Sequence, residues 1–291
     1  MPSLDLADMR RQYPEILGDW TVPQNWQRFS QAEHDVWRTL YRRLMDVLPG
    51  RACDEFLAGL ELLPLNEGIP DFEKLSAALM KATGWRVVAV PGLVPDDVFF
   101  EHLANRRFPA GNFIRAADSL NYIEEPDVFH DVFGHVPMLA HPVFADYMEA
   151  YGKGGLRAES EGTLHNLARL YWYTVEFGLV ETPKGLRIYG SGIASSSAES
   201  IYALEHASPN RIGFELERVM RTKYRIDDFQ ESYFVIEGFD QLFAETYNDF
   251  AALYKTLALG LTHEAGDVLG EDRVIHRGTR SYRPNSHAAS K

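Results

Sequence analysis

Apolar residues recur at helical spacing along most of this 291-residue chain. The pattern predicts a long helix after Ser30, because Glu33 completes a capping box and apolar residues between 36 and 48 follow at helical intervals. Pro49 and Gly50 end this run. The same spacing predicts further helices over about 53–63, 71–83, 96–104, 163–178, 198–207, 211–222 and 239–258. Short β-branched and aromatic runs predict strands at 87–90, 186–189 and 233–236. We therefore expect a mainly α fold with a few short β-strands.

No internal repeat and no low-complexity linker divides the chain, so the sequence predicts a single-domain fold. Residues 1–29 are polar and weakly periodic, which favours an irregular N-terminal arm. Residues 30–276 hold the periodic pattern and are expected to form this domain. From 277 to 291, Gly, Arg, Ser and Pro replace apolar residues, and we expect a disordered tail.

Composition and charge exclude several classes of function for this chain. Hydrophobic residues make up 45% and charged residues 24% of the chain, as in ordinary globular proteins. The 29 Lys and Arg against 42 Asp and Glu give a net charge of −13, which argues against nucleic acid or an anionic membrane as a partner. The one cysteine, Cys53, excludes an internal disulfide, a zinc–thiolate site and an iron–sulfur cluster. Without a signal peptide or an apolar run of about 20 residues, a cytoplasmic location is expected.

The segment from 124 to 137 carries the most informative chemistry. His130 and His135 are five residues apart, which on an ideal α-helix places them about 140° from each other. Gly134 is typical of a helix end, and Pro137 prevents the helix from continuing. We therefore expect the helix to end at Gly134, so that the chain turns and His135 comes back toward His130.

Two interpretations of this histidine pair are open. In the first, the two residues are unrelated, because most histidines are structural or solvated. In the second, they share a partner. The apolar neighbours Phe129, Val132 and Phe133 predict that at least one imidazole is buried and needs a polar partner. A metal ion is one such partner.

Glu176 is the candidate for a third ligand. It is the only acid between Leu170 and Val180, in an aromatic and aliphatic run. A buried carboxylate is costly unless it is paired or coordinates a cation, and a capped or salt-bridged glutamate would also fit. Two histidines and a carboxylate suit either a non-haem ferrous oxygenase or a zinc hydrolase. Zinc peptidases usually carry His-Glu-x-x-His, which this segment lacks, so iron is favoured.

Two motifs lie at 130–137, His-Asp-Val-Phe-Gly-His-Val-Pro, and at 171–179, Tyr-Trp-Tyr-Thr-Val-Glu-Phe-Gly-Leu. Together they closely resemble the pterin-dependent aromatic amino acid hydroxylases, and in particular the bacterial members that act on phenylalanine. The resemblance extends from about Trp85 to Tyr254. It implies an Fe(II)- and tetrahydropterin-dependent monooxygenase that hydroxylates L-phenylalanine to L-tyrosine with dioxygen. Tetrahydrobiopterin or a bacterial relative would be the co-substrate.

The resemblance also implies roles for individual residues. The iron ligands would be His130, His135 and Glu176. The residues beside the pterin would be Phe99, Asp131 and Tyr171. The substrate residues would be Arg115, Trp172 and Ser195, and Arg115 would hold the substrate carboxylate. Without the resemblance, we would interpret Phe99 as a core residue and Arg115 as half of a surface ion pair. Asp131 would be an outward-facing helix acid or a partner that orients a ligand.

The predictions of the substrate and of the assembly state rest on fewer residues. Tryptophan hydroxylases carry phenylalanine at the position that matches Trp172, whereas tyrosine hydroxylases share this tryptophan. Ile123 replaces a threonine that contacts the substrate in the animal enzymes, so that contact is expected to be missing or supplied otherwise. No heptad seam is present, and we expect a monomer. A tryptophan or tyrosine hydroxylase, a zinc hydrolase, and a non-catalytic pterin- or amino-acid-binding protein are the alternatives.

Overall fold

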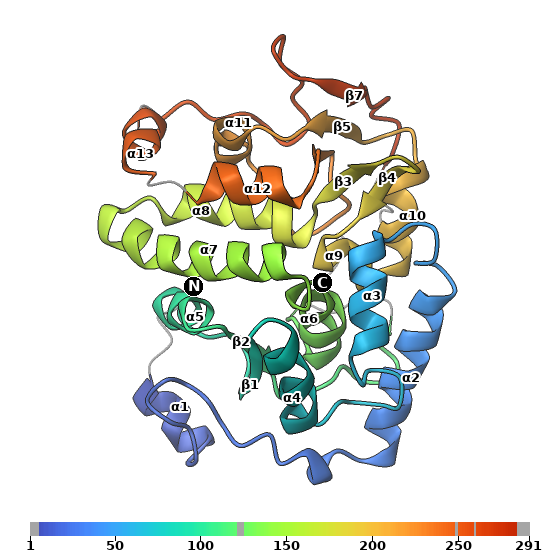
Figure 1. The fold of residues 1–291 in the computed structure, drawn as a ribbon, viewed down its shortest axis with the longest axis vertical. Coiled ribbons are helices and arrows are strands. Elements are labelled where there is room, and N and C mark those ends of the chain that lie inside the picture. Colours follow the sequence, from blue (N-terminus) through green and yellow to red (C-terminus); the bar gives the residue numbers. More distant parts are fainter. Residues whose placement is uncertain (1–5, 121–124, 248–249, 259, 284–291) are drawn as a thin grey trace.

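The computed structural model describes residues 6–120, 125–247, 250–258 and 260–283, and most of their elements are helices (Figure 1). The α-helices are α1 (Leu6–Gln12), α2 (Gln31–Met45), α3 (Asp54–Leu62), α4 (Phe72–Ala82), α5 (Asp96–Ala104), α6 (Val136–Leu139), α7 (Pro142–Glu161), α8 (Leu164–Tyr171), α9 (Ser191–Ala194), α10 (Ser197–Glu205), α11 (Leu216–Arg221), α12 (Phe239–Thr246) and α13 (Ala251–Leu257). The other helical segments are a 3-10 helix, η1 (Trp26–Arg28), and the π-helices η2 (Phe129–His135) and η3 (Trp172–Glu176). The expected mainly α fold with a few short strands is confirmed.

The strands of the described residues form two small sheets. One consists of β1 (Arg86–Val90) and β2 (Arg107–Gly111), which run parallel. The other has the strand order β4-β3-β6-β5-β7 and is built from β3 (Leu179–Thr182), β4 (Gly185–Ile188), β5 (Asn210–Gly213), β6 (Ser232–Ile236) and β7 (Val274–His276). Within it β3 and β5 run parallel to β6, while β4 and β7 are antiparallel edge strands. Every residue of the central strand β6 is buried.

Helix α7 crosses the middle of the molecule, with α4, α5 and β1–β2 on one side and α8, α12 and the larger sheet on the other (Figure 1). It packs closely on α5 because two of its three glycines face that helix. A Cβ at Gly152 would lie 2.4 Å from the Ala104 nitrogen, and one at Gly155 would lie 2.0 Å from the Phe100 ring. Sequence analysis predicts no helix at 142–161, since glycines weaken helix propensity.

Most of the predicted elements are confirmed. Ser30 caps α2 and exchanges hydrogen bonds with Glu33, as the capping box predicts. Two predicted helices are wrong in part. The helix expected over 211–222 begins only at Leu216, because residues 210–213 pair between β6 and β7 as β5. The helix expected over 239–258 is divided into α12 and α13.

The segments expected to be an irregular arm and a disordered tail make defined contacts where the structure describes them. The arm contains α1 and η1, and Trp20 within it is buried. In the tail, the Gly278 N–H donates to Asn210 over 2.9 Å and the Tyr282 hydroxyl donates to Asp228 over 2.9 Å. The division of the chain into 1–29, 30–276 and 277–291 stays a prediction.

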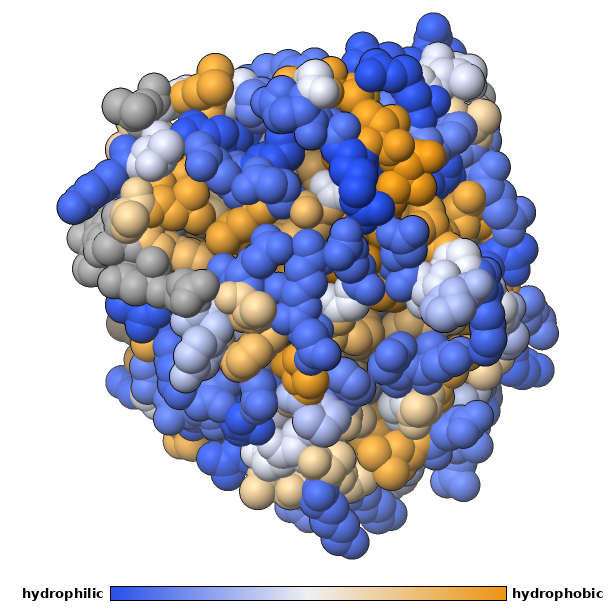
Figure 2. Space-filling model, turned by 45° about the horizontal axis from the view of Figure 1, so that its top comes forward, coloured by the Kyte–Doolittle hydropathy of each residue, from blue (hydrophilic) through white to orange (hydrophobic). Residues whose placement is uncertain are grey.

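One hydrophobic core runs through both sides of α7 and includes the fully buried rings of Trp37, Trp85, Phe129 and Phe133. Hydrophilic residues dominate the face shown in Figure 2, with separate hydrophobic patches between them. Across the described ranges, no helix is both long and apolar enough to cross a bilayer.

Candidate metal centre and active site

The two predicted histidine ligands lie on the π-helix η2. This helix runs directly into α6, and Gly134 does not take a left-handed conformation, so the prediction that the helix ends at Gly134 is wrong. In a π-helix each N–H bonds to a carbonyl five residues back, which brings residues five apart close together. The π geometry therefore replaces the expected turn, and the ring centroids of His130 and His135 lie 5.1 Å apart.

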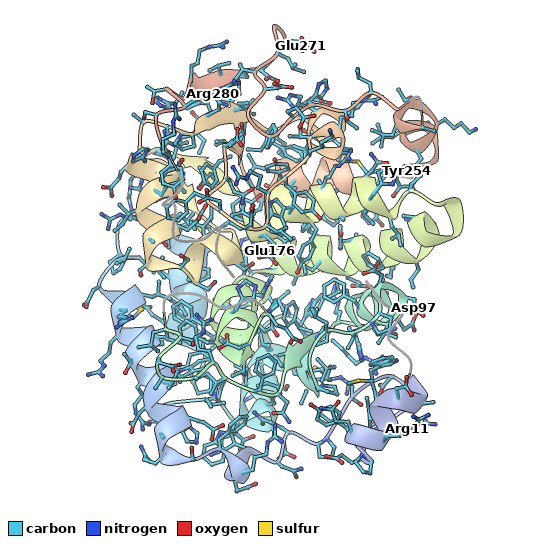
Figure 3. All side chains as sticks on the ribbon, turned by 180° about the vertical axis from the view of Figure 1, so that it is seen from behind. Arg11, Asp97, Glu176, Tyr254, Glu271 and Arg280 are labelled. Carbon is cyan, nitrogen blue, oxygen red and sulfur yellow. The ribbon has the colours of Figure 1, made fainter. Side chains whose placement is uncertain are left out.

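Glu176 is the last residue of the second π-helix, η3, which continues α8. Figure 3 shows it near the middle of the molecule. Its side chain is 14% exposed, so the predicted burial of this carboxylate is confirmed in large part. Single π turns inside helices are frequent at functional sites, and here both such segments carry predicted ligands.

Three side chains converge on one point. Nε2 of His130 lies 3.3 Å from Nε2 of His135, and Glu176 places Oε1 3.2 Å from His135 Nε2 and Oε2 3.6 Å from His130 Nε2. On an ion with bonds of about 2.1 Å, ligands at right angles stand about 3.0 Å apart. Two imidazole nitrogens and a carboxylate at these separations fit a divalent transition metal.

The proximity of Glu176 to the two histidines determines the electrostatics of the site. Burial opposes the charge of Glu176, yet His135 and His130 hold the pKa of its carboxyl well below the usual range. Burial also opposes a charge on His130, but Glu176 outweighs it and raises the pKa of this histidine to about 9. The carboxylate thus binds a positive charge at this point, and a divalent cation can supply it while leaving both imidazoles neutral.

The short helix α9 and its cap provide hydroxyl groups for two of the three candidate ligands. Ser191 donates to Oε2 of Glu176 over 2.9 Å, and Ser195 Oγ lies 3.0 Å from Nδ1 of His130. Bonds of this kind orient ligands and select the histidine tautomer. Ser195, which the resemblance places at the substrate, therefore also contacts a candidate ligand.

Gly134 allows α9 to approach η2. A Cβ added at this position would lie 3.0 Å from the carbonyl oxygen and 3.2 Å from Cβ of Ser191. The glycine is therefore explained by the close packing of α9, and not by an unusual backbone angle.

Arg115 forms a buried ion pair with Asp127. Its Nε and Nη2 donate to the two carboxylate oxygens, each over 2.8 Å, and its backbone N–H donates to Oδ2 over 2.9 Å. The side chains are 7% and 0% exposed, so the surface ion pair considered from the sequence is a buried one. Asp127 also accepts the backbone N–H of His130 over 3.0 Å, which links the predicted substrate arginine to a candidate metal ligand.

Asp131 also lies among these groups. One of its carboxylate oxygens and one nitrogen from each of His130 and His135 lie within 4.8 Å of one another. Its Oδ2 accepts the Gly111 N–H over 2.8 Å, and burial raises the pKa of its carboxyl to about 6. We favour Glu176 as the third ligand, because its oxygens face the two Nε2 atoms that meet.

The aromatic residues predicted for pterin and substrate lie on α5 and where α8 continues into η3. The rings of Phe99 and Tyr171 meet edge to face at 5.8 Å, and Tyr171 lies 6.1 Å from the His135 ring. Trp172 stacks on Tyr224 at 4.3 Å and contacts Phe177 at 4.8 Å. The structure thus brings Tyr171 and Trp172 to the same π-helical region as Glu176.

Two residues that support the site were not predicted, and one predicted position cannot be placed. Ile123 lies outside the described residues. Sequence analysis did not single out Asp127, although an acid in the first turn after Pro126 was an available signal. It missed Ser191 because nothing local distinguishes that serine.

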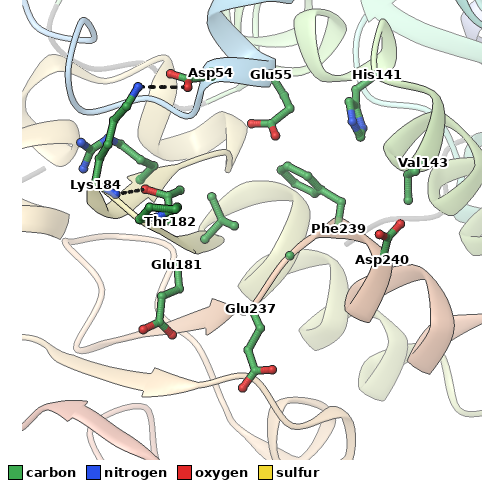
Figure 4. A pocket seen from close by; sticks show the side chains of 14 residues that line it. Asp54, Glu55, His141, Val143, Glu181, Thr182, Lys184, Glu237, Phe239 and Asp240 are labelled. Carbon is green, nitrogen blue, oxygen red and sulfur yellow. Dashed lines mark hydrogen bonds and ion pairs between the residues drawn. The ribbon is translucent and has the colours of Figure 1, made fainter.

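Figure 4 shows a separate hollow of about 520 Å³ between α3, the β3–β4 hairpin and the start of α12. Lys184 and Asp54 form an ion pair beside it over 3.3 Å. None of the residues that line it is a predicted site residue, so the hollow belongs to a different part of the surface.

A helical fold in which two histidines and a glutamate meet among aromatic side chains defines a candidate non-haem metal centre of the two-histidine, one-carboxylate class. The sequence profile of the biopterin-dependent aromatic amino acid hydroxylases matches residues 10–265. The chain belongs to this family.

Its relatives include proteins from several bacteria. The chain is 63% identical over 270 residues to the phenylalanine-4-hydroxylase of Caulobacter vibrioides, covering 92% of each chain. It is 57% identical to the phenylalanine hydroxylase of Chromobacterium violaceum in a structure with bound iron and phenylalanine, with a TM-score of 0.87 over 94% of this chain and 100% of that one. A second structure of that protein, with bound iron(III) and 7,8-dihydrobiopterin, gives the same values of identity, TM-score and coverage.

Proposed function

We propose that the chain is an Fe(II)- and tetrahydropterin-dependent monooxygenase that hydroxylates L-phenylalanine to L-tyrosine with dioxygen. The observation that carries the proposal is the meeting of His130, His135 and Glu176, with donor atoms 3.2–3.6 Å apart. Membership of a biopterin-dependent hydroxylase family supports the cofactor, and the names of the bacterial relatives support the substrate.

In this proposal His130, His135 and Glu176 hold the iron. Iron and tetrahydropterin supply the reducing chemistry that divides dioxygen between the substrate ring and the pterin. Ser191 and Ser195 orient two of the ligands through the hydroxyl contacts described above. The protein's contribution is thus a fixed set of donor atoms in a site largely shielded from water.

Arg115 holds the substrate carboxylate. Asp127 accepts one N–H from Nε and one from Nη2, so this ion pair leaves three of the five guanidinium N–H groups unused, two of them on Nη1. A charge-assisted bond from one of these N–H groups would fix the amino acid end, while Trp172 faces the aromatic end. Ser195 contributes a hydroxyl on the same side as His130.

Phe99, Tyr171 and Asp131 form the pterin side of the site. A flat heterocycle stacks favourably on an aromatic face, which Phe99 offers as a partly buried residue of α5. Asp131 is held by the Gly111 N–H and can accept a hydrogen bond from a ring nitrogen.

The decisive experiment removes the metal and restores Fe(II) or Zn(II) separately. With tetrahydropterin, dioxygen and phenylalanine, Fe(II) should restore tyrosine formation and Zn(II) should not. Omission of the pterin is the matched control, and tyrosine and tryptophan serve as competing substrates. Hydrolysis of a phenylalanine amide or ester that Zn(II) restores without pterin would replace the proposal with a hydrolase, and ligand binding without turnover would replace it with a binding protein.

We also propose that the chain is a monomer in the cytoplasm. The buried free thiol of Cys53 suits a reducing compartment. Sedimentation at micromolar concentration should give a mass near the 33.1 kDa of one chain, and a mass near twice that value would contradict the proposal. Cell fractionation tests the location.

A further inference from the structure

We propose that Gln230 is a positioning residue that sets the orientation of the Trp172 indole, and through it the affinity for the aromatic substrate. The inference rests on the proposed function, in which Trp172 contacts the amino acid. It concerns a residue outside the metal centre, on the loop between α11 and β6.

Gln230 is 2% exposed, and both the oxygen and the nitrogen of its side-chain amide form hydrogen bonds. Its Oε1 accepts the Trp172 indole N–H over 2.9 Å. Its Nε2 donates to the carbonyl oxygens of Arg225, over 2.9 Å, and Asp228, over 3.3 Å. Because carbonyl oxygens only accept, the amide nitrogen must face them, and the amide oxygen must face the indole. The acceptor for Trp172 is therefore held in one orientation.

The two aromatic contacts of Trp172 restrain the tilt of its ring more than its rotation within the ring plane. Tyr224 stacks on its face at 4.3 Å and 16°, and Phe177 lies against it at 4.8 Å and 34°. Stacking restrains the ring from tilting, but offset stacked rings tolerate rotation within the ring plane. The hydrogen bond to Gln230 is directional and prevents that rotation. It is the only hydrogen bond recorded for the indole nitrogen among the described residues.

Two further hydrogen bonds, besides that to the Trp172 indole, anchor the loop that carries Gln230. Tyr173 donates its hydroxyl to the Lys223 carbonyl over 2.6 Å, and Tyr282 donates to Asp228 over 2.9 Å. Gln230 thus acts from a supported position. Trp172 is also the first residue of η3, whose last residue is Glu176, so the indole and the candidate metal ligand belong to one π-helical segment.

The test is a double-mutant cycle with Gln230→Met and Trp172→Phe. Methionine keeps the length and loses the hydrogen bonds, while phenylalanine keeps a ring and loses the N–H. Loss of one neutral hydrogen bond predicts about a three- to tenfold weaker phenylalanine Kd by calorimetry, with a matching rise in KM. The KM for tetrahydropterin should stay within about twofold. In the Trp172→Phe background, Gln230→Met should add less than about twofold, because the partner N–H is already absent.

Tyr282→Phe is the matched control, since it removes a bond to the same loop without touching the indole, and it should leave the phenylalanine Kd unchanged. Gln230→Asn, which is too short to reach both partners, repeats the test if Gln230→Met does not fold. An equal loss of phenylalanine affinity from Gln230→Met in both backgrounds would show that Gln230 only supports the loop and would overturn the inference. A similar loss of affinity from Tyr282→Phe would overturn it in the same way. A wild type that forms no tyrosine overturns the proposed function itself, whereas an active wild type with an unaffected Gln230→Met overturns the inference alone.

Discussion

Arg115 and Asp127 form a two-pronged ion pair that is almost completely buried, and the carboxylate of this pair also accepts the backbone N–H of His130. Burial opposes the charge of Asp127, but the neighbouring guanidinium lowers the pKa of its carboxyl overall. One acid therefore fixes both the proposed substrate arginine and the start of the helix that carries the candidate metal ligands. A change at Arg115 must affect stability as well as binding.

Arg115→Ala should reduce both stability and substrate affinity. It leaves Asp127 buried without its partner, which costs about 3–5 kcal/mol in the free energy of unfolding. Loss of a charge-assisted contact of about 1.5–3 kcal/mol should weaken phenylalanine binding about ten- to a hundredfold. Urea unfolding and calorimetry measure the two effects separately. Arg115→Lys keeps the charge and loses the forked geometry, so it should show a smaller loss of stability.

Phenylalanine amide provides the control for this prediction. It lacks the negative carboxylate, so it should bind the wild type poorly and respond little to Arg115→Ala. If Arg115→Ala weakened the binding of phenylalanine, phenylalanine amide and the pterin equally, Arg115 would support only the fold.

Alanine substitution of His130, His135 or Glu176 should abolish hydroxylation and remove most of the bound iron while the circular dichroism spectrum is retained. The loss of iron affinity should exceed the roughly 10–100-fold effect of removing an outer hydrogen-bond partner. Asp131→Asn is the matched control, because Asp131 lies in the same cluster but bonds to Gly111. Normal iron content in any of the three alanine variants removes that residue from the ligand set.

Gly134→Ala should destabilise the site because the new methyl group would press on Ser191 of α9. We expect a cost of about 1–3 kcal/mol in the free energy of unfolding, as for other overpacked positions, together with weaker iron binding. Gly154→Ala is the contrasting variant. A Cβ there meets nothing within 4 Å, and removing a helix-interior glycine should stabilise the protein by about 0.5–1 kcal/mol. Similar stabilities for the two variants would contradict the packing argument.

Features of the fold and the site that have a local cause in the sequence could be predicted, whereas those that depend on distant contacts could not. The proximity of His130 and His135 is predicted correctly, but by a wrong route, because the segment forms a π-helix where Gly134 and Pro137 indicated a helix end. Helix α7 escapes prediction because its glycines serve contacts with α5, which are distant in sequence. Glu176 is recognisable because a lone acid in an apolar run has a local energetic cost, whereas the partner of Arg115 is defined only in three dimensions.

A buried carboxyl away from the metal centre predicts a pH dependence of stability. Glu199 on α10 is 6% exposed and accepts a hydrogen bond from the Tyr233 hydroxyl. Burial is the main cause that raises the pKa of Glu199 from 4.5 to about 7, and Asp228 adds to it. The folded protein therefore binds the Glu199 proton more tightly than the unfolded chain does.

The sign of the effect follows from proton linkage. Below about pH 4.5 both states carry the proton, and Glu199 contributes its full stability. Between about pH 4.5 and 7 the unfolded chain loses the proton first, so stability falls as the pH rises, by at most about 3 kcal/mol over this window. A glutamine at this position would stay neutral throughout, so the variant Glu199→Gln should gain stability relative to wild type as the pH rises from about 5 to about 8. Urea unfolding at four or five pH values gives this difference directly, and groups common to both proteins cancel. A difference that stays constant across the range would show that Glu199 titrates alike in the folded and unfolded states and that its burial is compensated by other contacts.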